Sequence, residues 1–151
     1  MFKTSSLLLA LSTILLSTAC QAQPKVTIST REGRELTFEV EIADTPVKRE
    51  LGFQYRRELA ANHGMIFLFS AEAEHPFWMK NTPIPLDMLF INNDRKIVGI
   101  VEEAVPFSLE SRSVPAPSRF VLEINGGLSR RYGLKAGDSV RFEGISADVR
   151  E

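Results

Sequence analysis

Polar side chains that could contact or transform a ligand gather in one stretch of this sequence, residues 77–91. A cation, an amide, a hydroxyl and a carboxylate follow the only tryptophan there, and two apolar runs enclose them. Aromatic rings beside a fixed cation are typical of binding hot spots, and a carboxylate near a base is the minimum for general acid/base catalysis. The residues in question are Trp78, Lys80, Asn81, Thr82 and Asp87.

Two prolines, Pro83 and Pro85, stiffen this stretch. Each fixes its own φ at about −65° and pushes the residue before it toward extended geometry, so the pattern predicts a strand, a rigid turn and a second strand. A rigid turn has little entropy to lose on binding, which favours ligand recognition there. It fits a structural corner equally well, with Asn81 and Thr82 bonding backbone groups that proline leaves unpaired, and such corners are common.

Asp87 stands at the start of a run that is apolar on both faces, which predicts a buried strand. An unpaired buried charge is costly, so we expect a partner such as Lys80, Arg56 or a backbone N–H. The partnership can be structural, as an ion pair or a turn cap. Alternatively, Asp87 is a carboxylate at the edge of a pocket, and a hydrolase-like enzyme would use it with Lys80 or His75.

The two histidines do not predict a metal site. His63 and His75 are expected in loops, without a cysteine or carboxylate at ligand spacing. The sequence also lacks a Gly-x-Ser-x-Gly elbow, a phosphate-binding loop and a His-Glu-x-x-His helix. We therefore expect no metal and no cofactor, and we assign no catalytic residue.

The first 19 residues have the features of an export signal. Lys3 supplies a positive charge, residues 7–16 are apolar but too few for a membrane span, and small residues follow at 17–19. The protein is therefore expected to leave the cytoplasm.

Cys20, the only cysteine, directly follows that segment, which resembles the signal of a bacterial lipoprotein. Such a signal implies cleavage before Cys20 and lipid on its sulfur and amino group, although Ser17 stands where these signals usually carry leucine. Gln21 is not the aspartate associated with inner-membrane retention, so we expect attachment to the periplasmic side of the outer membrane. The alternative is cleavage after Ala19 or Ala22, which gives a soluble periplasmic protein.

Charge and length limit what the mature protein can be. Removal of residues 1–19 takes away one cation and leaves 17 Lys and Arg against 19 Asp and Glu, a net charge of −2. This balance does not favour nucleic-acid binding. After a tether at residues 20–25, residues 26–145 are long enough for one domain with its own core, and residues 146–151 form a tail.

Alternating and continuous apolar runs predict a mostly β domain with a small antiparallel or mixed sheet of barrel type. A long loop rich in proline and serine is expected at residues 106–118, where it could flank a binding site. Strands are expected at residues 26–28, 36–42, 65–69, 88–91, 96–101, 120–124 and 140–143.

One or two short helices complete the predicted fold. The first ends at Gly52 and carries Val47 and Leu51 on its apolar face. The second is capped by Asn125 and ends at Gly133, since glycine accepts the left-handed conformation that ends helices.

Several segments of this chain resemble the signatures of the family called domain of unknown function 192. The resemblance covers roughly residues 26–145 and implies a compact, mostly β barrel-like domain that is often secreted, with no established activity. Gln54 departs from the family pattern, which usually has methionine there. The matching segments are residues 52–56 (GFQYR), 64–67 (GMIF), 77–88 (FWMKNTPIPLDM), 121–127 (VLEINGG) and 137–138 (GD).

Three classes of function follow from these residues. We expect first a periplasmic binding or accessory module, whose surface would be residues 78–82 together with Tyr55, Arg56 and the loop at 106–118. Its ligand could be a small molecule or a protein. The alternatives are a structural, envelope-associated domain without a ligand, and the hydrolase-like enzyme described above.

Overall fold

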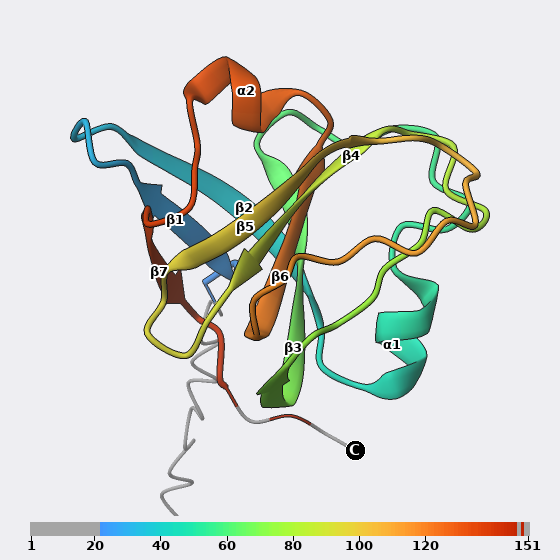
Figure 1. Cartoon of the computed structure of the whole chain (residues 1–151), viewed down its shortest axis with the longest axis horizontal. Helices are drawn as coiled ribbons and strands as arrows, with labels where there is room; N and C mark the ends of the chain where they lie inside the picture. Colours follow the sequence, from blue (N-terminus) through green and yellow to red (C-terminus); the bar gives the residue numbers. More distant parts are fainter. Residues whose placement is uncertain (1–21, 148, 150–151) are drawn as a thin grey trace, which may run out of the picture.

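The structure is a computed structural model that describes residues 22–147 and 149. Figure 1 shows one curled sheet of seven strands with two short helices beside it. In chain order the elements are β1 (Lys25–Ser29), β2 (Glu35–Ala43), α1 (Pro46–Leu51), β3 (His63–Ala73), β4 (Leu86–Ile91), β5 (Ile97–Ala104), β6 (Ser118–Asn125), α2 (Leu128–Tyr132) and β7 (Ser139–Glu143). The mostly β class predicted from the sequence is confirmed.

The sheet is mixed, with the strand order β5-β4-β6-β3-β2-β1-β7. β2 and β3 pair in parallel, and the other neighbouring strands pair antiparallel. Parallel neighbours need a crossover connection, and here residues 44–62, including α1, provide it. Within the described residues, neither helix has the length and apolar composition needed to span a membrane.

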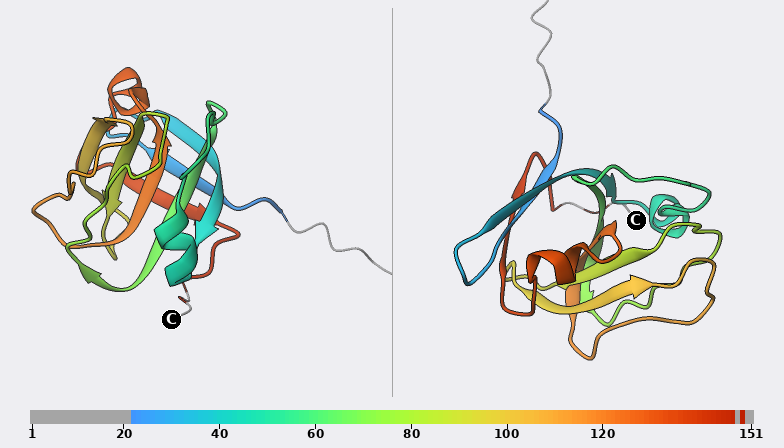
Figure 2. Two further views of the ribbon diagram at one scale, coloured as in Figure 1. Left: turned by 90° about the vertical axis from the view of Figure 1, so that its right-hand side faces the viewer. Right: turned by 90° about the horizontal axis from the view of Figure 1, so that it is seen from above.

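The curl of the sheet brings the beginnings of its two edge strands together. The Ile97 amide at the start of β5 donates to the Asp138 carbonyl (3.0 Å), and the Val140 amide of β7 donates to the Arg95 carbonyl (2.8 Å). The view from above in Figure 2 shows β1 and β2 on one side of the curl and β4 and β5 on the other. The result is a half-barrel, joined between its edge strands at these few residues.

Apolar side chains pack on both faces of the middle of the sheet. One cluster fills the curl, with Phe38, Leu122 and other residues of β1, β2 and β6. A second cluster, with Phe67 and Met88, lies on the opposite face. All six positions of β4 are therefore buried, and the few polar side chains at the centre of the sheet are buried with them.

Helix α1 ends at Gly52 as the sequence predicts, but its orientation differs from the prediction. Val47 and Leu51, expected to be buried, are 78% and 52% exposed. Arg49 faces the sheet instead: its Nη1 donates to the Leu68 carbonyl (2.9 Å), and its guanidinium lies 5.4 Å from the centre of the Phe69 ring. A helix of six residues presents only one or two positions to the sheet, and here Arg49 is the one that hydrogen-bonds to it.

The segment before β4 is a loop and not the strand that the sequence predicts. Phe77 forms only an isolated bridge with Arg112, because the chain then turns at residues 79–82, where the Thr82 amide donates to the Met79 carbonyl (3.1 Å). Residues 74–85 instead run beside the long loop at 105–117, which was predicted. Figure 1 shows the two loops together at the right of the molecule, next to α1.

Candidate functional site

Three loops are joined by backbone hydrogen bonds at this end of the molecule. The Met79 amide donates to the Ser108 carbonyl (2.9 Å), and the Phe107 amide donates to the Thr82 carbonyl (3.0 Å). The Tyr55 amide donates to the Asn81 carbonyl (2.7 Å) and so adds the loop after α1. We call the exposed surface that results the aromatic edge, and it consists of Tyr55, Arg57, Trp78, Lys80, Asn81 and Phe107.

Asn81 lies at the centre of the aromatic edge, in a turn closed by a bond from the Thr82 amide to the Met79 carbonyl (3.1 Å). Its φ of 54° is left-handed, a conformation that asparagine tolerates better than most residues. Its side-chain amide donates to Oε1 of Gln54 (3.1 Å) and to the Tyr55 hydroxyl (2.8 Å). Asn81 therefore fixes the loop after α1 through both its backbone and its side chain.

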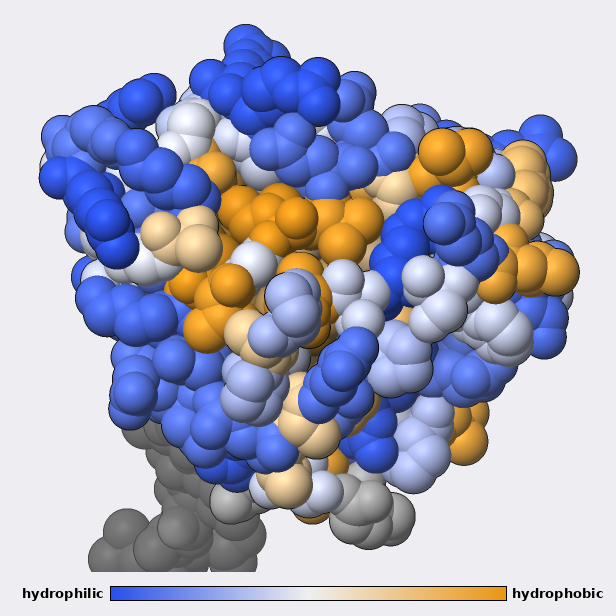
Figure 3. Space-filling model, in the orientation of Figure 1, coloured by the Kyte–Doolittle hydropathy of each residue, from blue (hydrophilic) through white to orange (hydrophobic). Residues whose placement is uncertain are grey.

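Trp78 and Lys80 form an exposed platform beside this turn. Trp78 is 42% exposed, and the Lys80 ammonium lies 4.9 Å from the centre of its ring. That distance is within the range of a cation–π contact. In Figure 3, apolar side chains gather over this loop end at the right of the view, separate from the larger apolar area below α2.

Thr82 belongs to the same turn but does not reach the surface. It is 4% exposed, and its hydroxyl donates to the Lys80 carbonyl (3.1 Å). The Thr82 side chain thus has the structural role in a corner that the sequence allowed for it.

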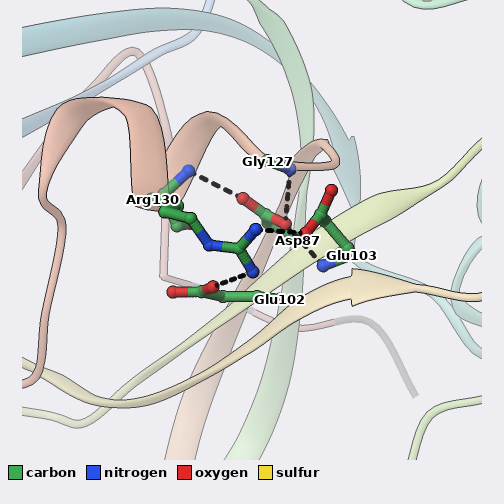
Figure 4. A network of polar contacts seen from close by, with 6 residues as sticks. Asp87, Glu102, Glu103, Gly127 and Arg130 are labelled. Carbon is green, nitrogen blue, oxygen red and sulfur yellow. Dashed lines mark hydrogen bonds and ion pairs between the residues drawn. The ribbon is translucent and has the colours of Figure 1, made fainter.

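Asp87 lies in a different and fully buried environment, which we call the Asp87 junction (Figure 4). Its carboxylate accepts hydrogen bonds from the backbone amides of Glu103 (2.8 Å), Gly127 (2.9 Å) and Ser129 (2.7 Å). Gly127 and Ser129 begin α2, so Asp87 caps this helix, for which the sequence predicted Asn125. The side-chain amide of Asn125 instead donates to the Leu59 carbonyl (2.9 Å).

The contacts of Asp87 are those of a structural residue. Of the partners that the sequence suggested, the structure provides backbone amides and neither Lys80 nor Arg56. The salt bridges of Arg130 with Glu102 and Glu103 (2.9 and 2.8 Å) cover the junction. The structure therefore does not bring Asp87 into one site with Lys80.

Arg56 points away from the aromatic edge, although it follows Tyr55 directly. Its guanidinium makes a two-pronged salt bridge with Glu41 of β2, and Nη2 and Oε2 are 2.7 Å apart. This hydrogen bonding raises the pKa of Arg56. Arg57, which the sequence analysis did not select, lines the hollow next to Tyr55 instead.

The remaining residues selected from the sequence are not part of this surface. His75 stacks on Phe69 with ring centres 3.6 Å apart, and burial lowers its pKa. His63 lies in an exposed position beside Glu39, at 3.5 Å. Cys20 and the export segment lie outside the described residues, and no group of three or more metal-ligating His, Cys, Asp or Glu side chains occurs within them.

Comparison with known proteins assigns the chain to a family. The family model DUF192 (Uncharacterized ACR) matches residues 27–142. The chain belongs to the DUF192 family. The protein named UPF0127 protein PF1050, from Pyrococcus furiosus, is 23% identical over 121 residues, which cover 76% of this chain and 96% of that protein.

Two solved structures are similar to this DUF192 protein. One, from Sinorhizobium meliloti 1021, is described as a "putative transcription regulator"; it is 42% identical, with a TM-score of 0.78 over 83% of this chain and 97% of that one. The other is a protein of unknown function from Novosphingobium aromaticivorans, 40% identical, with a TM-score of 0.75 over 78% of this chain and 83% of that one.

The sequence analysis missed three residues that shape the aromatic edge of this DUF192 protein. Phe107 is 63% exposed with a φ of 60°. It lies in the proline- and serine-rich loop that the sequence places beside the binding surface, and its aromatic ring could have identified it there. Arg57 had no signal beyond its charge. Gln54, noted only as a departure from the family pattern, accepts a hydrogen bond from Asn81.

A second buried carboxylate, Glu123 of β6, also went unselected. It is 4% exposed and lies opposite Met65 of β3 and Met88 of β4. Among the described residues its side chain has no hydrogen-bond or ion-pair partner. Burial raises the pKa of Glu123 to about 8, so this carboxyl group is mainly protonated at neutral pH.

Proposed function

We propose that this protein is an exported, lipid-anchored binding module and that its ligand contacts the aromatic edge. One observation carries the proposal. Five non-glycine residues in the described ranges have positive φ, and three of them, Tyr55, Asn81 and Phe107, line a single hollow. A bulky side chain in this conformation is unusual, and each such residue costs roughly 1–3 kcal/mol.

Packing does not account for the strained aromatic residues. Tyr55 is 71% exposed and Phe107 is 63% exposed, so neither ring gains the apolar burial that would offset its backbone conformation. Strained conformations held at an exposed surface are typical of ligand-binding and catalytic sites. The hydrogen bonds of Asn81 hold the surface in shape before a ligand arrives, which reduces the entropy lost on binding.

Binding is better supported than the enzyme that the sequence left open. A hydrolase-like mechanism would need Asp87 near Lys80 or His75 and open to a substrate. Asp87 is 0% exposed and already accepts three backbone hydrogen bonds. His75 stacks on Phe69. No acid and base pair is therefore assembled from these residues.

Export and lipid attachment are also part of the proposal. The charged start, the short apolar run and the small residues before Cys20 support them, and β1 begins at Lys25, only a few residues after the proposed lipid. Mass spectrometry of the mature protein is expected to find a lipid-modified cysteine at its N-terminus. A free Cys20, or an N-terminus after Ala22, would contradict the anchor.

DNA is not the partner that these residues favour, although one similar structure is described as a transcription regulator. The mature chain has a net charge of −2. Several of its surface arginines are already paired with carboxylates, such as Arg56 with Glu41 and Arg130 with Glu102. A DNA-binding surface needs a stripe of available cations to contact phosphates.

A complementation experiment tests the binding surface in cells. Trp78→Ala removes the platform of the aromatic edge, and Val47→Ala is its matched control, because Val47 is an exposed apolar side chain on α1. Both variants are expected to fold and to keep the wild-type protein level, with Val47→Ala at the wild-type melting temperature and Trp78→Ala slightly below it, because part of the Trp78 ring is buried. In a deletion strain, measured by competitive fitness across growth conditions, Val47→Ala should complement and Trp78→Ala should not. Full complementation by Trp78→Ala would overturn the proposed surface.

A further inference from the structure

The hollow at the centre of the aromatic edge has the size of a site for a small ligand. Its volume is about 270 Å³, and its lining residues are Tyr55, Arg57, Asn81, Pro83 and Phe107. Sites for drug-sized molecules usually exceed about 300 Å³. The hollow therefore suits a molecule with about one ring and a short polar substituent.

The charge of this hollow differs from that of four other hollows on the surface. These four each include at least one glutamate, namely Glu50 in two of them and Glu41 in the other two. The hollow of the aromatic edge is lined by no carboxylate, and it has one cation, Arg57. It is thus suited to a negatively charged group.

Arg57 is free to bind such a group. Its neighbour Arg56 is held by Glu41, whereas Arg57 is exposed and has no hydrogen-bond or ion-pair partner among the described residues. Guanidinium groups bind carboxylates through two parallel hydrogen bonds, so an unpaired arginine in a hollow without carboxylates has its full donor capacity available.

The second polar group of the hollow, the Tyr55 hydroxyl, can also donate a hydrogen bond to a ligand. The Tyr55 hydroxyl oxygen accepts a hydrogen bond from the Asn81 side chain (2.8 Å), which leaves the hydroxyl hydrogen to be donated elsewhere. The rings of Phe107 and Pro83 supply the apolar part of the lining. An aromatic ring of a ligand can pack against the Phe107 ring, as aromatic pairs do in proteins.

On the basis of the proposed function, we propose that this hollow binds a small aromatic carboxylate. The carboxylate accepts hydrogen bonds from the Arg57 guanidinium and the Tyr55 hydroxyl, and the ring lies against Phe107 and Pro83. The strained conformations of Tyr55 and Phe107 place these groups around one small volume. The ligand is thereby recognised by one charge and one flat apolar face.

Matched probes test this inference on the protein without its export segment and Cys20, residues 21–151. Binding of 3-phenylpropionate, its neutral amide 3-phenylpropionamide and phenyl phosphate is measured by chemical-shift titration of ¹⁵N-labelled protein. We expect 3-phenylpropionate to bind about tenfold more tightly than the amide, since a hydrogen bond to a charged group is worth that much. The largest shifts should be at Tyr55, Asn81 and Phe107.

Two variants assign the recognition of the charge. Arg57→Gln is expected to remove the difference between the acid and the amide. Arg131→Gln is the matched control, because Arg131 is an exposed arginine on α2 whose side chain only packs on its neighbour Tyr132, and it should leave both affinities unchanged. Equal melting temperatures of the two variants would exclude unfolding as the cause of any loss.

The possible results separate this inference from the proposed function. Equal binding of the acid and the amide, tighter binding of phenyl phosphate than of 3-phenylpropionate, or shifts outside the hollow would each overturn the aromatic carboxylate. None of these results would affect the complementation test of Trp78→Ala, because Trp78 does not line this hollow. Full complementation by Trp78→Ala, in turn, would overturn the proposed function whatever the probes bind.

Discussion

The Asp87 junction and the aromatic edge are a few residues apart in sequence and are built on opposite principles. At the junction, the buried Asp87 carboxylate accepts three hydrogen bonds, all from backbone amides. These bonds join β4 to β5 and α2. At the aromatic edge, aromatic and cationic side chains such as Tyr55 and Arg57 are exposed. The polar groups of the Asp87 junction are buried and hydrogen-bonded within the protein, whereas the side chains of the aromatic edge are exposed and can contact a ligand.

Pro83 and Pro85 separate the two regions. They end the turn of Asn81 and commit the chain to the extended conformation in which it enters β4. The Gly126 amide donates to the Pro85 carbonyl (2.9 Å), so the entry of β4 is fixed beside the start of α2. Polar residues that are neighbours in sequence therefore need not share a role. Substitutions at the Asp87 junction and at the aromatic edge are expected to affect stability very differently.

Asp87→Ala should be the most damaging of these substitutions. It leaves three buried or partly buried amides without an acceptor, and the expected loss in the free energy of unfolding is roughly 3–5 kcal/mol. Urea denaturation at pH 7 measures it. Asp94→Ala, in the exposed turn between β4 and β5, is the control and should change stability by less than about 0.5 kcal/mol. A small effect of Asp87→Ala would show that the amides find other partners.

Glu123→Gln tests burial of a carboxyl group without hydrogen-bond donors. The folded chain holds a proton on Glu123 between the ordinary pKa of 4.5 and about 8, whereas the unfolded chain has released it. Stability should therefore fall as pH rises through this window, by about 1.4 kcal/mol per pH unit, and level off above it. Glu123→Gln should remove this slope and stabilise the protein at pH 7 by roughly 3 kcal/mol.

The exposed Glu58 supplies the control for that measurement. Urea denaturation is repeated from pH 5 to 9 for both variants, and Glu58→Gln should keep the wild-type pH dependence. A wild-type protein whose stability does not change across this range would mean that Glu123 is ionised in the folded state and has found a partner.

Local features of the fold were predictable from the sequence because they depend on neighbouring residues. The alternation in β2, the proline at the start of α1 and Gly133 at the end of α2 each determine a backbone conformation by themselves. The strand expected at residue 77 is wrong for a reason that is also local, since the chain turns at residues 79–82, directly after the bridge of Phe77 with Arg112.

Burial of Glu123 and the partners of Asp87 were not predictable in this way. Glu123 alternates with the apolar residues of β6, a pattern typical of a strand with one solvent-exposed face. Whether that face is covered depends on loops that are distant in sequence. Two of the three donors to Asp87 likewise come from the start of α2, some 40 residues later.

The exposed part of the candidate site was predicted only in outline. Trp78, Lys80 and Asn81 were found because their types and the nearby prolines gave a signal, and Tyr55 because it lies in a segment that resembles the family. Positive φ values at Tyr55 and Phe107 have no sequence signal, since aromatic residues disfavour that conformation. Hydrogen bonds between loops that are distant in sequence hold both residues in place, such as that from the Tyr55 amide to the Asn81 carbonyl.

Substitutions of Asn81 divide its contribution between hydrogen bonds and backbone conformation. Asn81→Ala loses both side-chain hydrogen bonds and places a less tolerant residue at a φ of 54°, with an expected loss of about 1–2 kcal/mol. Asn81→Gly also loses the hydrogen bonds but tolerates that φ, so its loss should be smaller. Thermal unfolding of both variants measures the difference, and an equal loss in the two would mean that the conformation carries no strain.

Lys80→Gln should have the smallest effect on stability, and this sharpens the contrast with Asp87. The Lys80 ammonium contacts the exposed face of Trp78 and, among the described residues, makes no ion pair. A cation–π contact at such a site is worth about 0.5–1 kcal/mol, and part of it is regained because glutamine also packs on the ring. Urea denaturation should therefore find a change below about 0.5 kcal/mol. A loss as large as that of Asp87→Ala would place Lys80 among the structural residues and remove it from the ligand-contacting surface.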